Sequence, residues 1–225
     1  MAPFWRIGGL SGLTFVVVFG IIQVTSGEPS RAATQPEITR YLAGHQTSNE
    51  VFGVLALLLG GFVVLFAVAV WALLHSGRKD LSPTWPMIGL VGGVVMAVNL
   101  ALLGATFAAE GSLGDKLATQ PVLAQTVFTS EQTLGTAIFP FIALLLLGMG
   151  MATLESKALP VWSAWLAFAG AVLSVVLTLQ LVFPGSVLDV VGAAHALVTL
   201  GWIAIVSIYM LLPQPLATMA RARTA

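Results

Sequence analysis

An aspartate and a histidine lie within one strongly apolar stretch near the end of the sequence. Residues 185–202 read GSVLDVVGAAHALVTLGW and contain Asp189 and His195. Because an ionisable side chain in hydrocarbon is costly, each of the two is a candidate for a functional site. On a helix they lie about 9 Å apart along the axis and about 120° apart around it, so other helices must supply their partners.

Polar side chains occur at a similar depth in the other apolar stretches. Asn99, Thr106 and Glu110 share one face of a helix, because steps of seven and four residues return to the same side. The remaining stretches carry further carboxyl, amide and hydroxyl side chains, at Gln23, Asn49, Glu50, Glu131, Gln132, Thr136, Thr178 and Gln180. Together these groups predict a mostly apolar cavity in the outer half of a helix bundle, with a few fixed polar contacts.

The expected chemistry of this cavity is general acid and base catalysis on a lipid-soluble small molecule. We expect Asp189 and either Glu50 or Glu131 to donate and accept the proton, with His195 as a second catalytic candidate that also orients the substrate. The predicted substrate-binding residues are Asn99, Asn49, Gln132, Thr136 and Gln180.

The sequence predicts neither a metal nor another cofactor. The chain has no cysteine, which excludes thiolate zinc sites, iron–sulfur clusters and thiol nucleophiles. A zinc site at His195, Asp189 and Glu131 has suitable ligand types, but no paired spacing on one helix supports it. For haem, only the pairing of His45 with His195 remains as a weaker alternative.

A competing interpretation assigns the acidic residues to helix starts. A hydroxyl followed three residues later by Glu, Gln or Asp is typical of an N-cap, and such patterns include Glu50, Glu131 and Asp189. Glu110 is expected at a solvated helix end. Asn99 and His195 lie too far from any helix start for this interpretation, and their alternative role is a hydrogen bond that joins two helices.

Composition places the chain in a membrane. Hydrophobic residues make up 58% of its 225 residues and charged residues only 8%, and the mean hydropathy is +0.99. A soluble domain does not have this balance. The formal net charge is zero, so nothing indicates nucleic acid as a partner. The expected partners are the membrane and a lipophilic small molecule or lipid, and a homo-oligomer is left open.

Six apolar stretches are long enough to cross a bilayer as helices, so we predict one all-α transmembrane domain over residues 1–225. The spans are expected at about residues 7–25, 49–75, 86–109, 132–154, 160–183 and 187–212. With a cytoplasmic amino terminus, six Lys and Arg residues lie inside and three outside. This bias predicts that both termini are cytoplasmic.

The loops and one proline add local detail. Thr34 and Glu37 form a capping box with Pro36 in the first turn, which predicts a short outer surface helix over about residues 36–45. Pro140 lies deep in the fourth span and is expected to kink it. No repeat is visible, and the loop lengths of the two halves do not correspond as they would in an inverted-repeat transporter.

Two segments carry a family resemblance. Residues 36–45 (PEITRYLAGH) and 157–166 (KALPVWSAWL) resemble a group of actinobacterial six-helix integral membrane proteins of unknown function. The resemblance implies the six-helix architecture, an outer surface helix and a multi-pass location in the bacterial cytoplasmic membrane. It implies no activity and no functional residues.

Three functions are compatible with the sequence. The first is a cofactor-independent isomerase, cyclase or hydrolase acting on a lipophilic molecule. The second is a small proton-coupled transporter or exporter that uses the same carboxyl groups as a proton relay. The third is a membrane-embedded accessory subunit. The lack of a repeat favours the enzyme over the transporter, and the polar cluster favours both over the subunit.

Overall fold

The described part of the chain consists of helices and short connections, with no strand. The computed structural model describes residues 4–29, 33–75, 82–183 and 186–212, without the side chains of residues 186, 187 and 189. The elements are α1 (Phe4–Thr25), α2 (Gln35–Gly44), α3 (Gln46–His75), α4 (Thr84–Thr119), α5 (Pro121–Ala137), α6 (Phe139–Ser156), α7 (Val161–Thr178), the short 3₁₀ helix η1 (Leu179–Leu181) and α8 (Ser186–Leu211).

In the part of the chain that the structure describes, six helical segments are long and apolar enough to cross a membrane. Five of them are α1, α3, α4, α7 with η1, and α8. The sixth is α5 with α6, which meet at a break at Ile138, two residues before Pro140. Proline has no N–H to donate and its ring clashes with the preceding turn, so the break agrees with the predicted kink. The chain is therefore an all-helical, multi-pass membrane protein.

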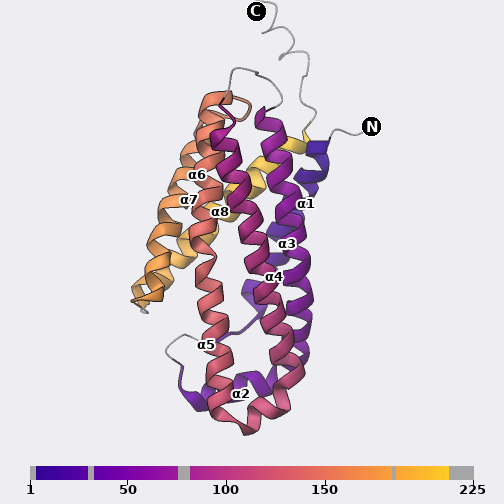
Figure 1. Cartoon of the computed structure of the whole chain (residues 1–225), viewed down its shortest axis with the longest axis vertical. Coiled ribbons are helices and arrows are strands. Elements are labelled where there is room, and N and C mark those ends of the chain that lie inside the picture. The colour runs from indigo at the N-terminus through magenta and orange to yellow at the C-terminus, as the bar shows by residue number, and fades with distance from the viewer. Residues whose placement is uncertain (1–3, 30–32, 76–81, 184–185, 213–225) are drawn as a thin grey trace, which may run out of the picture.

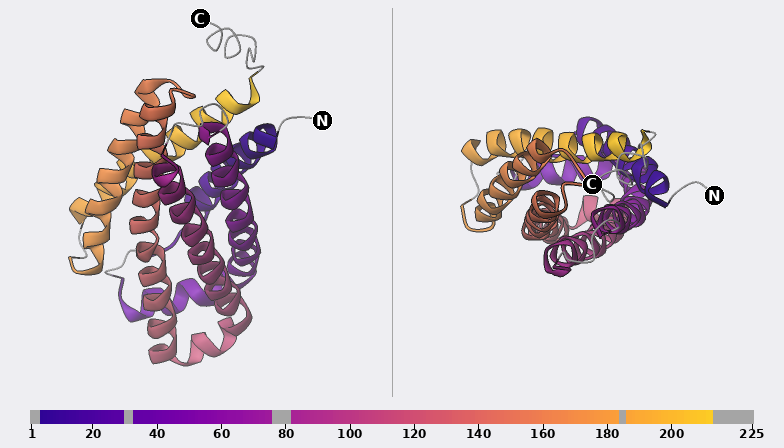
Figure 2. Two further views of the ribbon diagram at one scale, coloured as in Figure 1. Left: turned by 45° about the horizontal axis from the view of Figure 1, so that its top comes forward. Right: turned by 90° about the horizontal axis from the view of Figure 1, so that it is seen from above.

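The six spans form a ring. Helix α3 packs against α1 and α4, α4 against α6, α6 against α7, α7 against α8, and α8 returns to α1. Figure 2 shows this arrangement from above, with α8 crossing one side of the bundle. Contacts across the ring are few and join mainly α3 to α6. The centre of the ring must therefore be filled by side chains or remain open.

Large side chains fill the centre of the ring in the half that contains the start of α1 and the end of α8. Phe66, Leu145, Met149 and Trp202 are all at most 2% exposed there. The rings of Phe66 and Trp202 meet edge to face, with centroids 6.0 Å apart. This packing closes that end of the bundle, so an open centre is confined to the other half.

Three segments are longer than a membrane requires. Helix α3 has 30 residues, α4 has 36, and α5 with α6 spans 36. At 1.5 Å per residue these are roughly 45 to 54 Å long, whereas a hydrocarbon core is about 30 Å thick. In Figure 1 they extend together past α1, α7 and α8 at the end where α2 lies. We call this end the α2 end.

Helix α2 is fixed to the α2 end by a small core of its own. Ile38, Tyr41 and Leu42 are buried against α4 and α5, where they pack with Leu117 and Phe128. The predicted surface helix is therefore present at Gln35–Gly44, but one face of it is covered.

The predicted capping box at the start of α2 is confirmed. The backbone N–H and the hydroxyl of Thr34 donate to Glu37 Oε2 at 2.7 and 2.8 Å. These two hydrogen bonds hold the pKa of Glu37 below its usual value. The bond from the backbone N–H has the larger effect.

Glycines allow α3 and α4 to approach closely. A Cβ at Gly53 would lie 2.7 Å from the carbonyl oxygen of Gly104 and 2.8 Å from the backbone nitrogen of Ala108. Both neighbours are backbone atoms, which cannot move aside without separating the helices. Small residues are the usual means of such close packing between membrane helices.

We expect Gly53→Ala to destabilise the fold by about 1–3 kcal/mol, because the added methyl group overpacks the α3 and α4 contact. Gly61→Ala is the matched control on the same helix, since a Cβ there meets nothing within 4 Å. Alanine is the better helix former, so the control should be neutral or slightly more stable. Unfolding in mixed detergent measures both. Equal stability of the two variants would contradict the close contact between α3 and α4 at Gly53.

Candidate functional site

The open part of the ring is a cavity of about 530 Å³ at the level where α1 ends. This volume lies within the range of sites for drug-sized ligands. Helices α1, α3, α4, α5, α6 and α8 all contribute to its wall, together with the segment that follows α1. Most of the wall is apolar, and five phenylalanines supply much of it: Phe15, Phe19, Phe52, Phe107 and Phe139.

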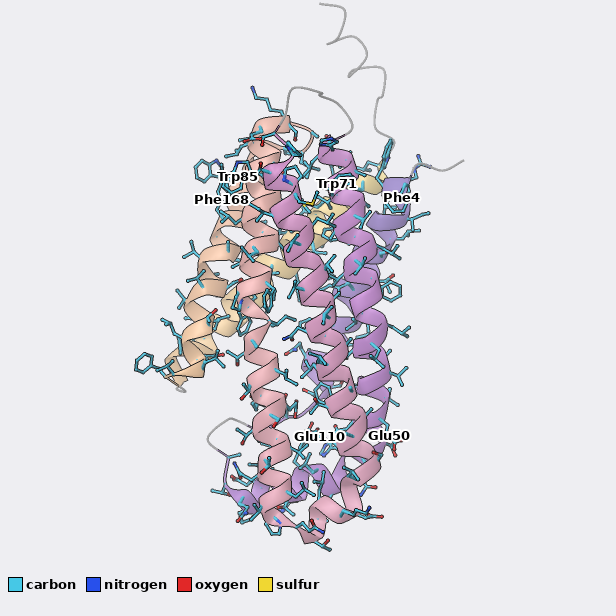
Figure 3. The ribbon with its side chains drawn as sticks, in the orientation of Figure 1. Phe4, Glu50, Trp71, Trp85, Glu110 and Phe168 are labelled. Atoms are coloured by element: carbon cyan, nitrogen blue, oxygen red, sulfur yellow. The ribbon has the colours of Figure 1, made fainter. Side chains whose placement is uncertain are left out.

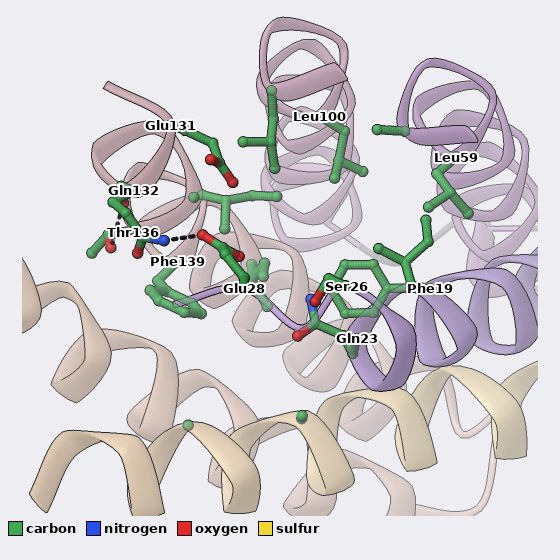
Figure 4. Close-up of a pocket in the computed structure, with 18 of the residues that line it drawn as sticks. Phe19, Gln23, Ser26, Glu28, Leu59, Leu100, Glu131, Gln132, Thr136 and Phe139 are labelled. Atoms are coloured by element: carbon green, nitrogen blue, oxygen red, sulfur yellow. Dashed lines mark hydrogen bonds between the residues drawn. The ribbon is translucent and has the colours of Figure 1, made fainter. Parts of the chain in front are cut away.

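Carboxyl and amide groups form one end of the cavity. Glu131 and Gln132 come from α5, and Glu28 comes from the segment between α1 and α2. Figure 4 shows these side chains turned toward one another, with the amide of Gln132 donating to Glu28 Oε1. Glu131 is only 2% exposed, and its Oε2 has no hydrogen-bond partner among the described residues. A buried carboxyl oxygen without a partner is costly, so a proton or a ligand is expected at this atom.

A third carboxyl group lies behind Glu131. Glu110 is fully buried and contacts the Glu131 carboxyl group, which also contacts Glu28. The amide of Asn49 donates to Glu110 Oε2 at 3.2 Å, while Glu110 Oε1 has no partner in the described part of the chain. Ionised carboxylates have no proton to donate, so a hydrogen bond between two of them requires one to be protonated. This cluster of Glu28, Glu110 and Glu131 is therefore suited to hold a proton.

Helix α2 adds a phenol to the surroundings of the cluster. The hydroxyl of Tyr41 lies 3.5 Å from Asn49 Oδ1. Burial, followed by the negative charge of Glu28, raises the pKa of Tyr41 above its usual value. The phenol therefore stays protonated and donates toward Asn49.

The carboxyl cluster lies near the edge of the membrane. Glu110 is 26 residues after the start of α4 at Thr84, and Glu131 is 25 residues before the end of α6 at Ser156. At 1.5 Å per residue both are roughly 37 to 39 Å from the opposite end of their segments. A hydrocarbon core is about 30 Å thick, so the cluster is at the level of the lipid headgroups. Its polar groups are less costly there than at the centre of the bilayer.

His195 lies deeper, on the opposite part of the cavity wall. It is 5% exposed, and it is 16 residues before the end of α8 at Leu211, or about 24 Å along the helix. Its ring packs edge to face on Phe139, with centroids 5.2 Å apart. Phe139 follows Glu131 by eight residues. Glu131 and Phe139, whose ring packs on the imidazole, are thus about 12 Å apart along their membrane span.

A serine fixes the tautomer of His195. Ser174 Oγ lies 2.8 Å from His195 Nε2 and also donates to the carbonyl oxygen of Gly170 at 2.8 Å. A hydroxyl has one proton, so Ser174 satisfies both contacts only when His195 Nε2 carries a hydrogen. The network therefore assigns the proton to Nε2 and leaves Nδ1 as the proton acceptor of the imidazole.

The structure brings together five of the nine residues predicted for the site. Glu131, His195, Gln132, Thr136 and Gln180 all line the cavity.

Of the other four predicted residues, three are described and are not among the residues that line it. Asn49 is fully buried beside Glu110, outside the cavity. Asn99 is also buried, and its Oδ1 has no partner in the described part of the chain, but it is not part of the cavity wall. Glu50 is exposed on α3, and Figure 3 labels it at the α2 end together with Glu110. The side chain of Asp189 lies outside the described residues.

Three expected helix ends are wrong, because α3, α4 and α5 continue beyond the apolar stretches. Helix α4 runs to Thr119, so Glu110 is buried within the helix and is not a solvated end. Helix α5 begins at Pro121, ten residues before Glu131, so this residue is not an N-cap. Glu50 likewise lies within α3, which begins at Gln46.

Sequence reasoning missed Glu28 and Ser174. Glu28 is in a loop beside Pro29 and belongs to no apolar or capping pattern. Ser174 is one of several hydroxyl residues in apolar helices, where bonding to the carbonyl four residues earlier is common. Only the packing of α7 on α8 distinguishes it, because that contact brings it to His195.

The fold and the cavity define a multi-pass helical membrane protein with a carboxyl cluster at one end of an aromatic cavity. Among the described residues, no three His, Asp or Glu side chains are placed to hold a metal ion. Comparisons of the chain with protein families, characterised proteins and solved structures find no match.

Proposed function

We propose that this protein binds a lipophilic small molecule in the cavity and catalyses a proton transfer on it without a cofactor. The observation that supports this function best is the placement of Glu131 and His195 on the wall of one aromatic cavity, with His195 packed on Phe139, eight residues after Glu131. An acid and a base at two ends of a site act on two positions of an elongated substrate.

The corresponding reaction class is isomerisation, including ring closure. Glu131 delivers a proton to one end of the substrate, and a new bond to hydrogen forms there. His195 Nδ1 removes a proton from the other end, and the electron pair of the broken bond moves through the substrate. The substrate keeps its composition, and water at the membrane surface exchanges the two protons. Hydrolysis by the same groups is the alternative reaction.

The proposed location is the bacterial cytoplasmic membrane, with both termini in the cytoplasm, in agreement with the resemblance to actinobacterial six-helix proteins. The charge bias across the loops supports this orientation. The α2 end and the cavity then face the outside, so a substrate enters from the outer leaflet.

Cysteine labelling tests the orientation, because the chain has no cysteine of its own. Thr84 and Thr119 are exposed at opposite ends of α4. In intact cells we expect an impermeant maleimide to label Thr119→Cys and to leave Thr84→Cys unlabelled until the cells are opened. The reverse pattern would invert the orientation and place the cavity at the cytoplasmic face.

A proton-coupled exporter is the second candidate, because three carboxyl groups in contact at the cavity end are suited to pass protons. Among the described residues, the side chains around Phe66 and Trp202 pack closely between the cavity and the opposite end of the bundle, which favours the enzyme.

A comparison of turnover and transport decides between the two functions. We expect purified protein in nanodiscs to convert a candidate lipophile with no ion gradient present. Uptake into sealed vesicles that stops on addition of a protonophore, without conversion, would instead establish transport.

A further inference from the structure

We infer that the molecule bound in the cavity carries a positively charged head, such as a protonated amine, which pairs with the carboxyl group of Glu131. This inference rests on the proposed function only for the location of the ligand. It requires Glu131 to be ionised when the ligand binds, with the proton of the cluster held by Glu110.

The first support is the unpartnered carboxyl oxygen at the cavity end. Glu131 is 2% exposed and lines the cavity, and its Oε2 has no hydrogen-bond partner in the described part of the chain. Buried carboxylates are normally paired with a cation or with several donors. A ligand that brings a cationic N–H group to Oε2 supplies both the charge and the donor.

The second support is the sign of the charges around the cavity. The described lining residues include the acids Glu28 and Glu131 but no lysine or arginine. The carboxyl group of Glu110 lies directly behind that of Glu131 and contacts it. An anionic head, such as a carboxylate or a phosphate, would meet like charges at close range in a site with little water. Among the described lining residues, the charges therefore favour a cationic head over an anionic one.

The third support is the aromatic wall. The faces of phenylalanine rings attract cations, and the attraction increases when the site excludes water. Phe19 and Phe139 line the same cavity as Glu28 and Glu131, and Figure 4 labels all four. The remaining wall is apolar and accommodates a hydrocarbon or aromatic body. The cavity thus combines the two features that recognise a lipophilic cation, a buried carboxylate and aromatic rings.

A second explanation of the unpartnered carboxyl oxygens is a proton shared between Glu110 and Glu131. In that case the cluster is already neutralised, and a neutral ligand with a hydroxyl group fits as well as a cation. The two accounts differ in the charge selectivity of binding, which is measurable without knowledge of the natural ligand.

Tetraphenylphosphonium and tetraphenylborate provide the test, because they have nearly the same shape and opposite charge. Binding is measured by equilibrium dialysis on protein in nanodiscs of zwitterionic lipid, with empty nanodiscs subtracted. We expect the wild-type protein to bind the cation at least about tenfold more tightly than the anion. Glu131→Gln should remove this preference. Glu155→Gln, near the end of α6 away from the cavity, should retain it.

The possible results separate the inference from the proposed function. Equal binding of the two ions by the wild-type protein would overturn the inference even if Glu131→Gln failed to fold. A cation preference that persists in Glu131→Gln would overturn it as well. A phenylalanine placed in the cavity at Gly192 should abolish binding of the cation. If it does not, the cavity is not the binding site, and the proposed function fails together with the inference.

Discussion

Glu131→Gln is expected to lower substrate turnover by about 100-fold to 10,000-fold, the usual contribution of a general acid or base. Glutamine has nearly the same shape as glutamic acid, but it has no proton to deliver. It also removes one of three carboxyl groups that contact one another, so the folded protein should be at least as stable as the wild type. Initial rates and the thermal midpoint, measured on the same preparation, separate the two effects.

The control for this prediction is Glu155→Gln. Glu155 lies near the opposite end of the same membrane span, 24 residues after Glu131, so it undergoes the same chemical change far from the cavity. Its turnover should equal that of the wild type. If Glu131→Gln retained the wild-type rate, or if it lost activity only through a lower thermal midpoint, Glu131 would have no role in proton transfer.

Gly192→Phe is expected to abolish ligand binding and turnover while leaving the bundle folded. Gly192 lines the cavity, and a Cβ there meets nothing within 4 Å. A phenylalanine at this position therefore enters the open space without displacing backbone. Its ring takes up part of a cavity of about 530 Å³, so a ligand that fills the cavity no longer fits.

Gly201→Phe is the matched control on the same helix. A Cβ at Gly201 also meets nothing within 4 Å, and the residue does not line the cavity. The two glycines are nine residues apart, which places them on opposite sides of α8. Both variants should elute as folded monodisperse protein, and only Gly192→Phe should lose binding. Equal binding by the two variants would show that the ligand binds elsewhere.

The sequence by itself determined the class of protein, the six spans and the break near Pro140. Each of these is set by local properties, since a run of apolar residues long enough to cross hydrocarbon must form a helix, and a proline interrupts one. The sequence also indicated Glu131 and His195, because an ionisable group inside an apolar run is unusual wherever its neighbours lie.

The tertiary structure alone decided which polar groups meet. The long α4 and α5 continue past the apolar stretches, and this places Glu110 and Glu131 in the interior instead of at helix ends. Glu28 enters the cluster from a loop, 82 residues before Glu110 in the chain. Asn99 is not among the residues that line the cavity, although its depth along α4 is similar to that of His195 along α8. Depth along a helix is a property of the sequence, but the direction that a side chain faces depends on the order of the helices around the ring.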